Sequence, residues 1–297
     1  MRPRLYVTCP SYAINNPRDR AGRLKPAQLW ADAFGWEVVP SPLLAHYHAP
    51  NSWLPVEDRA EDLRVALDHE IVWAARGGYA AIELVPALLA ATPAKPPLLL
   101  GYSDITVLHA CWAKRAWGPT LYGTFADQTA DSRQAASLSA YLRGEQYRCD
   151  RATEPAVWVL RPGAVRAPIF AACLVVLANL CGTPAMPTLA GQILAIEDTD
   201  ERPYAIDFAL HQLHLAGALD RIVGLLGGSF YHTPQADYGG PSVDDILRIW
   251  AERLAVPALS RLPFGHMDDP MVVPIGVPAE LDAAADGRWS LVWRAGV

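Results

Sequence analysis

The sequence predicts an α/β protein in which a parallel sheet flanked by helices is followed by a smaller α/β unit. Three observations predict this class. Short apolar stretches alternate with longer stretches of helical periodicity, the order typical of parallel sheets. Hydrophobic residues make up 52% of the 297 residues and charged residues 19%, the composition of a chain that buries a core. A charged, proline-containing stretch near the middle separates two such patterns.

The N-terminal half should fold as alternating strands and helices. We expect strands at 5–8, 37–39, 80–84 and 97–100, and helices at 26–34, 59–75 and 105–117. Gly35 follows the first helix, at a position where glycine commonly ends helices. Because strand and helix alternate, the strands should be parallel, with helices on both faces of the sheet.

Residues 144–168 change the character of the chain, because charged side chains, together with Pro155 and Pro162, replace the apolar pattern. We therefore expect an N-terminal domain at 1–145, a linker at 146–167 and a C-terminal domain at 168–297. In the C-terminal domain we expect strands at 192–197 and 222–226, helices at 206–216 and 243–253, and a tail of short antiparallel strands at 272–293.

Composition and charge exclude several classes of protein. The net charge of −6 gives no general attraction for nucleic acid or anionic lipid. No signal-peptide core and no stretch of about 18 apolar residues is present, so we expect no membrane span. The five cysteines are scattered and form no CxxC pair, which is typical of a reducing compartment such as the cytoplasm.

The segment LLLGYSDI at 98–105 is the strongest local signal for chemistry. An apolar strand there runs into Gly-x-Ser and then into a helix. A serine on such a turn projects its hydroxyl above the sheet edge, where the following backbone N–H can help to form an oxyanion hole. Ile105 stands where the common motif has its last glycine. The turn alone also fits a second interpretation, in which Ser103 only caps the next helix.

A second glycine turn, Gly77-Gly78, lies between the expected helix 59–75 and strand 80–84. Paired glycines let a backbone approach a ligand closely and present its N–H groups. Glycine also ends helices, and taken alone this turn is better explained in that way.

The sequence resembles the LD-carboxypeptidase family, which includes the microcin-immunity peptidases. The strings that carry the resemblance span nearly the whole chain: RAEDL at 59–63, RGGY at 76–79, GYSD at 101–104, LAIEDTDERPYAID at 194–207, PFGH at 263–266 and PIGVPAEL at 274–281. The N-terminal sheet would then be flavodoxin-like or amidotransferase-like, with the active site between the two domains.

The resemblance implies a catalytic triad, with Ser103 as nucleophile, His266 as base and Glu197 as the carboxylate that orients the base. It also implies that the backbone N–H groups of Gly78 and Asp104 form the oxyanion hole. Members cleave the L,D amide bond between meso-diaminopimelate and the terminal D-alanine of murein tetrapeptides. They are cytoplasmic, commonly homodimeric, and use no metal or other cofactor.

Two features of the motifs qualify this picture. Many members carry Gly-Gly-Asn-Leu at the start of the second domain, where this chain has Ala171-Ala172-Cys173-Leu174. We expect that difference to affect substrate preference and to leave the triad intact. Asp198 directly follows Glu197, and since neighbours on a strand point to opposite faces, only one of the two can reach His266.

Other readings of the sequence lead to different functions. His46 and His48, or His211 and His214, could face one another, but neither pair has the third ligand that catalytic zinc requires. His109 follows the serine turn, and we expect it to be structural. The alternative functions are a peptidase that cleaves a peptidyl-nucleotide antibiotic and a non-catalytic muropeptide-binding protein. An amidotransferase would need cysteine at the nucleophile turn, where this chain has serine.

Overall fold

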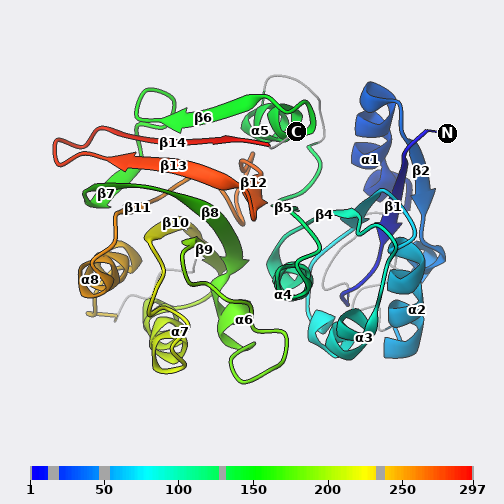
Figure 1. Ribbon diagram of the computed structural model, residues 1–297, viewed down its shortest axis with the longest axis horizontal. Coiled ribbons are helices and arrows are strands. Elements are labelled where there is room, and N and C mark those ends of the chain that lie inside the picture. The colour runs from blue at the N-terminus through cyan, green and yellow to red at the C-terminus, as the bar shows by residue number, and fades with distance from the viewer. Residues whose placement is uncertain (1, 13–19, 47–53, 127–131, 232–237, 296–297) are drawn as a thin grey trace.

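A computed structural model describes residues 2–12, 20–46, 54–126, 132–231 and 238–295 of the chain. Its first sheet has the strand order β12-β5-β4-β3-β1-β2 (Figure 1). The strands are β1 (Arg4–Thr8), β2 (Glu37–Pro40), β3 (Ile71–Ala74), β4 (Leu98–Gly101), β5 (Thr120–Tyr122) and β12 (Val273–Ile275). β1 to β5 run parallel to one another, as expected, whereas β12 pairs antiparallel with β5.

Helices cover both faces of this sheet. They are α1 (Arg20–Phe34), α2 (Val56–Ala66), α3 (Val85–Ala90), α4 (Thr106–Arg115) and α5 (Arg133–Leu142). Alternate residues of β1 point to the two faces: Leu5 lies in one buried cluster with Trp30 of α1, and Tyr6 lies in the other with Leu63 of α2.

Two predicted elements of the N-terminal half are wrong. The helix expected at 59–75 begins at Val56 and ends at Ala66, and Ile71–Ala74 is instead the buried strand β3. The strand expected at 80–84 is a 3₁₀ helix, Ala81–Leu84, entered through Ala80 at a φ of 79°. The first error arises because a strand buried on both faces is apolar throughout, so its pattern resembles that of a buried helix.

The second sheet has the order β6-β14-β13-β8-β9-β10-β11-β7. Its strands are β6 (Gln146–Asp150), β7 (Trp158–Arg161), β8 (Gly163–Cys173), β9 (Ile193–Thr199), β10 (Gly224–Tyr231), β11 (Ala258–Ser260), β13 (Pro278–Ala283) and β14 (Trp289–Arg294). β8 to β11 are parallel, and the remaining pairs are antiparallel. Its helices are α6 (Leu174–Ala178), α7 (Pro203–Leu215) and α8 (Val243–Leu254). The antiparallel tail was predicted correctly.

The stretch 146–167, expected to be a linker, forms β6, β7 and the first part of β8. All three strands belong to the second sheet, which therefore has more strands than the first. The polar pattern that suggested a linker arises because β6 and β7 lie at the two edges of that sheet. Each edge strand has a neighbour on one side only, so its side chains are partly exposed.

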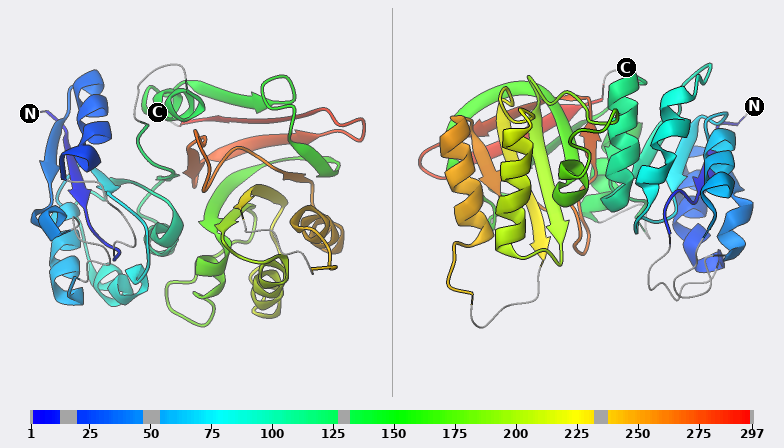
Figure 2. Two further views of the ribbon diagram at one scale, coloured as in Figure 1. Left: turned by 180° about the vertical axis from the view of Figure 1, so that it is seen from behind. Right: turned by 90° about the horizontal axis from the view of Figure 1, so that it is seen from below.

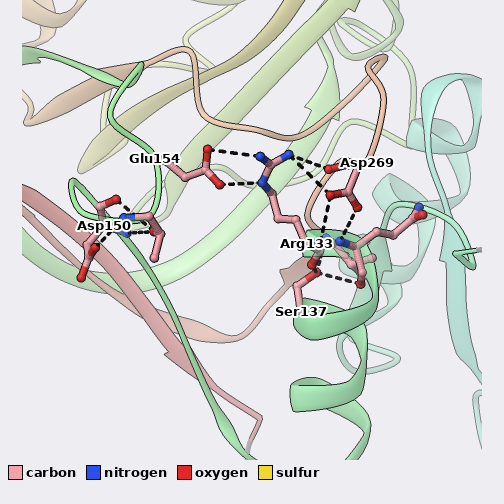
Figure 3. Close-up of polar contacts among 8 residues, drawn as sticks. Arg133, Ser137, Asp150, Glu154 and Asp269 are labelled. Atoms are coloured by element: carbon pink, nitrogen blue, oxygen red, sulfur yellow. Dashed lines mark hydrogen bonds and ion pairs between the residues drawn. The ribbon is translucent and has the colours of Figure 1, made fainter. Parts of the chain in front are cut away.

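The two sheets lie side by side (Figure 2). β12, from the C-terminal part of the chain, pairs with β5 in the first sheet and contacts β8 of the second. A polar cluster strengthens the junction (Figure 3). Arg133, the first residue of α5, pairs with Glu154 between β6 and β7, and its Nη1 donates to the backbone oxygen of Asp269. The Asp269 carboxylate accepts the backbone N–H groups of Arg133 and Gln134 at 2.9 Å each. Asp269 thus ties the loop after β11 to the start of α5.

Candidate active site

Ser103 lies directly after β4, on a turn whose backbone conformation is unusual for a serine. Its φ of 64° falls in the left-handed region, which costs energy for any residue that carries a Cβ. Gly101 permits the turn, because a Cβ there would lie 2.6 Å from Cγ2 of Ile105. Such a strained strand-to-helix turn is the geometry that exposes a nucleophilic hydroxyl in α/β hydrolases.

The glycine turn that precedes β4 in the chain packs against this serine. A Cβ on Gly77 would lie 2.8 Å from Cβ of Ser103 and 3.2 Å from its Oγ. Gly78 has a φ of 136°, and a Cβ there would overlap the backbone oxygen of Tyr12. Gly77 therefore lies against the expected nucleophile, and Gly78, the expected oxyanion residue, follows it in contact with the backbone of Tyr12, where no side chain would fit.

The buried ends of the RAEDL string hold this region together. Arg59, wholly buried, donates to the backbone oxygens of Pro10 and Ala80 and forms an ion pair with Glu83. Asp62 accepts the hydroxyls of Tyr6 and Thr8 and the N–H of Cys9. Through these bonds α2 supports the chain on both sides of the glycine turn.

Asp104, whose backbone N–H is the other expected oxyanion donor, has its carboxylate inside the same scaffold. Its Oδ2 accepts the Ser11 hydroxyl at 2.7 Å and the Ala81 N–H at 2.9 Å. Burial raises the pKa of this carboxyl, although both hydrogen bonds favour the ionised form. The side chain thus fixes the turn that carries Ser103.

Glu197 and His266 meet as the sequence predicted. Oε2 of Glu197 lies 2.7 Å from Nδ1 of His266 and accepts the His266 backbone N–H at 3.0 Å. Gly265 makes this approach possible, since a Cβ there, at a φ of 97°, would overlap the Glu197 side chain. Glu197 is fully buried and His266 is partly exposed.

The environment of His266 favours its charged form. Burial alone would lower the pKa of this imidazole, but the hydrogen bond and the charge of Glu197 raise it above the usual value, with help from Asp198 and Asp200. A partly buried imidazole held by a buried carboxylate is the arrangement that lets histidine act as a general base.

Asp198 points away from the pair, as the alternation along β9 requires. Its two oxygens accept the N–H groups of Val175 and Thr199 at 2.9 Å each. Burial raises the pKa of Asp198 to about 6. The carboxylate therefore stabilises the start of α6, and it influences His266 only through its charge.

Tyr122, at the end of β5, is a site residue that the sequence analysis missed. Its hydroxyl donates to Oε1 of Glu197 at 2.6 Å and accepts the N–H of Ser103 at 3.2 Å. The ring of Tyr102 also lies between the two halves, 5.1 Å from the ring of His266. Nothing in the string TLYGT distinguishes Tyr122 from an ordinary core tyrosine, so no sequence signal could have revealed it.

Three other histidines considered as candidates contact neighbouring residues of the fold. His109 bonds to Thr120 and to the backbone oxygen of Gly101 at 2.8 and 2.9 Å, and burial lowers its pKa to about 4. His211 and His214 pack against the ring of Trp250. The His46–His48 pair cannot be assessed, because 47 and 48 lie outside the described residues. Among the residues that the structure describes, no cluster of His, Cys, Asp and Glu could hold a metal ion.

The replaced Gly-Gly-Asn string forms the end of β8. Ala171 and Ala172 are fully buried, and the N–H of Cys173 donates to the hydroxyl of Thr106 at 3.0 Å. Cys173 pairs with Glu197 in the register of β8 and β9. Burial raises the pKa of the Cys173 thiol well above its ordinary value, so the thiol stays neutral. The substitution lies beside the candidate triad.

A strained serine turn beside a glycine turn, with a histidine–carboxylate pair across a domain junction, defines a hydrolase of the serine type. Comparison with known proteins shows the family. The profile of the LD-carboxypeptidase N-terminal domain matches residues 5–123, and that of the C-terminal domain matches 166–281. The chain belongs to the LD-carboxypeptidase family and is a peptidase of that type.

Individual relatives agree with this placement. A Streptomyces coelicolor protein, provisionally named a carboxypeptidase, is 33% identical over 94% of this chain and 90% of its own. The crystal structure of muramoyltetrapeptide carboxypeptidase from Oxalobacter formigenes covers 98% of this chain and 100% of its own, with 26% identity and a TM-score of 0.76. The microcin C7 self-immunity protein MccF shares the fold, with a TM-score of 0.75 at 17% identity over 98% of this chain and 97% of its own.

Proposed function

We propose that this protein is a serine carboxypeptidase that removes the terminal D-alanine of murein tetrapeptides by cutting its amide bond to the L-centre of meso-diaminopimelate. One observation carries the proposal: the buried Glu197 carboxylate holds His266 at 2.7 Å, at the junction where β4 delivers Ser103. The Oxalobacter relative, named for this reaction, supports the choice of substrate.

In the proposed mechanism, Ser103 Oγ attacks the carbonyl carbon while His266 accepts the hydroxyl proton. The resulting oxyanion is stabilised by the backbone N–H groups of Gly78 and Asp104. His266 then returns the proton to the leaving amine, and D-alanine departs from an acyl-enzyme. Water, activated by the same histidine, hydrolyses the ester and regenerates Ser103. Glu197 keeps the imidazole in one tautomer and stabilises its charged form.

We further propose that the protein acts in the cytoplasm as a homodimer. All five cysteines are free, which fits a reducing compartment. Within the described residues, no helix is long and apolar enough to cross a membrane. Light scattering of the purified protein would measure the mass of the assembly and decide between monomer and dimer.

The reaction is tested by incubating purified murein tetrapeptide with the protein and analysing the products by mass spectrometry. We expect a tripeptide and free D-alanine, at a rate unchanged by excess chelator. Ser103→Ala protein serves as the control for contaminating peptidases. Tetrapeptide that remains intact under these conditions would reject the proposed substrate.

The second candidate is a peptidase that cleaves a peptidyl-nucleotide antibiotic. Such an enzyme would need aromatic side chains on which a nucleobase can stack. Two exposed tyrosines adjoin the site: Tyr79 follows Gly78, and Tyr231 pairs with Thr199 at the end of β9. Parallel assays with an aminoacyl sulfamoyl nucleoside and with the tetrapeptide would decide between the two substrates. A non-catalytic binder would process neither substrate and would not react with a serine-directed phosphonate.

A further inference from the structure

Tyr122 is a side chain that bonds to both halves of the candidate site. It is 1% exposed and ends β5 in the first sheet. The backbone N–H of Ser103 can only donate, so the phenol oxygen accepts that bond, at 3.2 Å. The single phenol proton is therefore directed to the Glu197 carboxylate, at 2.6 Å. One hydroxyl thus connects the nucleophile turn to the acid of the triad.

Glu197 depends on this hydroxyl because its carboxylate is fully buried. Oε2 accepts hydrogen bonds from the backbone N–H and from Nδ1 of His266, and Oε1 accepts one from the Tyr122 hydroxyl. A buried charge is costly unless donors satisfy it. Without Tyr122, Oε1 would lose the partner that fixes the rotation of the carboxylate and keeps Oε2 aimed at the imidazole.

We propose that Tyr122 is a positioning residue for the reaction, which sets the orientation of Glu197 and holds the backbone of Ser103 in its left-handed conformation. This inference rests on the proposed function of the Ser103–His266–Glu197 triad. It assigns the coupling between the nucleophile turn and the acid of the triad to a single hydroxyl, and it gives β5 a role in the chemistry.

The phenol is suited to remain a donor under all working conditions. Burial, together with the charge of Glu197, raises the pKa of Tyr122 well above its usual value. Asp198 on β9, Asp200 just after it and Cys173 on β8 also lie near the His266–Glu197 pair and can titrate. None of these three bonds to the Glu197 carboxylate within the described structure, so removal of the Tyr122 hydroxyl leaves Oε1 with a vacant acceptor site.

The test is Tyr122→Phe, which keeps the ring that packs edge-on against Tyr102 at 6.4 Å and beside His109 at 5.7 Å. Loss of a hydrogen bond to a buried charge should lower kcat about 10- to 100-fold, with KM changed by no more than about threefold. The acid limb of kcat/KM should move to higher pH. When His266 is neutral, the pair carries the full negative charge of Glu197 and needs the lost donor most. When His266 is protonated, the pair is neutral overall and needs the donor less, so the pKa of His266 rises.

Tyr6→Phe is a matched control, because the Tyr6 hydroxyl also donates to a buried carboxylate, that of Asp62, at 2.6 Å. It should lower the thermal midpoint and leave the pH of the acid limb in place. If Tyr122→Phe does not fold, difluorotyrosine at position 122 replaces it. That side chain is a stronger donor of the same shape, so the limb should move to lower pH.

The pH dependence of Ser103 labelling by a serine-directed phosphonate gives a readout that does not depend on the peptide substrate. If the wild-type protein labels normally but leaves the tetrapeptide intact, only the proposed substrate is rejected, and the positioning role of Tyr122 is unaffected. A Tyr122 variant that labels at the wild-type rate, with the wild-type pH dependence, would overturn the positioning role. A wild-type protein that does not label would overturn it as well, since there would be no activated serine to position.

Discussion

Ser103 combines a reactive position with an unfavourable backbone conformation. Its φ of 64° is maintained by contacts on three sides: the Gly77 turn, the Tyr122 hydroxyl, and the Asp104 carboxylate bonded to Ser11. Strain of this kind persists only where the surrounding structure enforces it. The hydroxyl therefore contributes little to folding, and its removal should separate catalysis from stability.

Ser103→Ala should lower kcat by a factor on the order of 10³ or more, because attack on the carbonyl has no other nucleophile of comparable placement. Alanine meets the same backbone penalty as serine at this φ, so the thermal midpoint should change little. Steady-state kinetics and calorimetry measure the two effects. A variant with near-normal turnover would mean that Ser103 only shapes the start of the helix.

Glu197→Gln should retain the fold, because the amide can keep a carbonyl oxygen toward His266 while the Tyr122 hydroxyl turns to accept its NH₂ group. We expect kcat to fall on the order of 10³, since a neutral amide cannot stabilise the imidazolium. Asp198→Asn is the control, because in the described structure Asp198 bonds to two backbone N–H groups and to the Cys173 side chain and makes no hydrogen bond to His266. Comparable losses of kcat in both variants would contradict the assignment of Glu197.

The activity should fall on the acid side at a pH above the ordinary imidazole value of 6.5, because the pKa of His266 is raised and the base must be neutral to accept a proton. A profile of kcat/KM against pH measures this limb. Asp198→Asn removes one of the charges that raise the pKa, so it should shift the limb to lower pH. A limb below that of free imidazole would show that His266 is not the base.

At this scale the sequence predicted three of the four residues that meet at the junction. Ser103, Glu197 and His266 stand in family strings that can be recognised without a structure. Tyr122 does not, because its contact with Glu197 is a hydrogen bond between β5 and β9, two strands of different sheets. A single sequence carries no information on that contact.

Among the elements, α5 carries a second connection to the site through its N-terminus. Ser132 caps the helix and accepts the N–H of Ala135 at 2.9 Å. Asp269, from the loop that also carries His266, accepts two further N–H groups of the first turn (Figure 3). The hydroxyl of Ser137 accepts the N–H of Val272 at the end of the same loop. The hydrogen bonds between α5 and this loop therefore both cap the helix and hold the loop that carries His266.

Asp269→Ala should lower stability by about 1 kcal/mol, the usual effect of losing a helix cap, and should also reduce kcat severalfold by loosening the His266 loop. Ser132→Ala is the matched control, because it removes a cap of the same helix without touching that loop. Its stability should fall by a similar amount and its kcat should not change. Denaturant titrations and kinetics on both variants test this; equal kcat values would reject the coupling.

Helices with a clear period were predicted well, whereas of the short buried strands β4 and β9 were predicted and β3 and β5 were not. α7 and α8 have strong caps or apolar faces, and both were found within three residues of their ends. β3 was read as helix, because a strand in the middle of a parallel sheet shows no alternation. β12 lies within the predicted antiparallel tail, but its pairing with β5 could not be predicted, since it joins residues about 150 positions apart.

In the whole molecule, the boundary between the two family domains is not a boundary of the core. One buried cluster includes Leu63 and Trp112 from the N-terminal part as well as Phe170 and Leu281 from the C-terminal part. β12 belongs to the C-terminal part of the chain and completes the first sheet. The site lies where these connections concentrate, so the geometry of the triad depends on both sheets being folded.

We therefore expect the protein to unfold in a single cooperative transition, although proteins with two domains often unfold in two. Separate melting of the first sheet would strip β12 from β5 and would open the cluster shared by Leu63 and Phe170. Those losses should make the half-folded state unfavourable. Differential scanning calorimetry should show one peak whose van't Hoff and calorimetric enthalpies agree. Covalent labelling of Ser103 by a phosphonate, which would contact both sheets, should shift that whole peak upward, whereas two resolved peaks, only one of them shifted, would show that the sheets are independent.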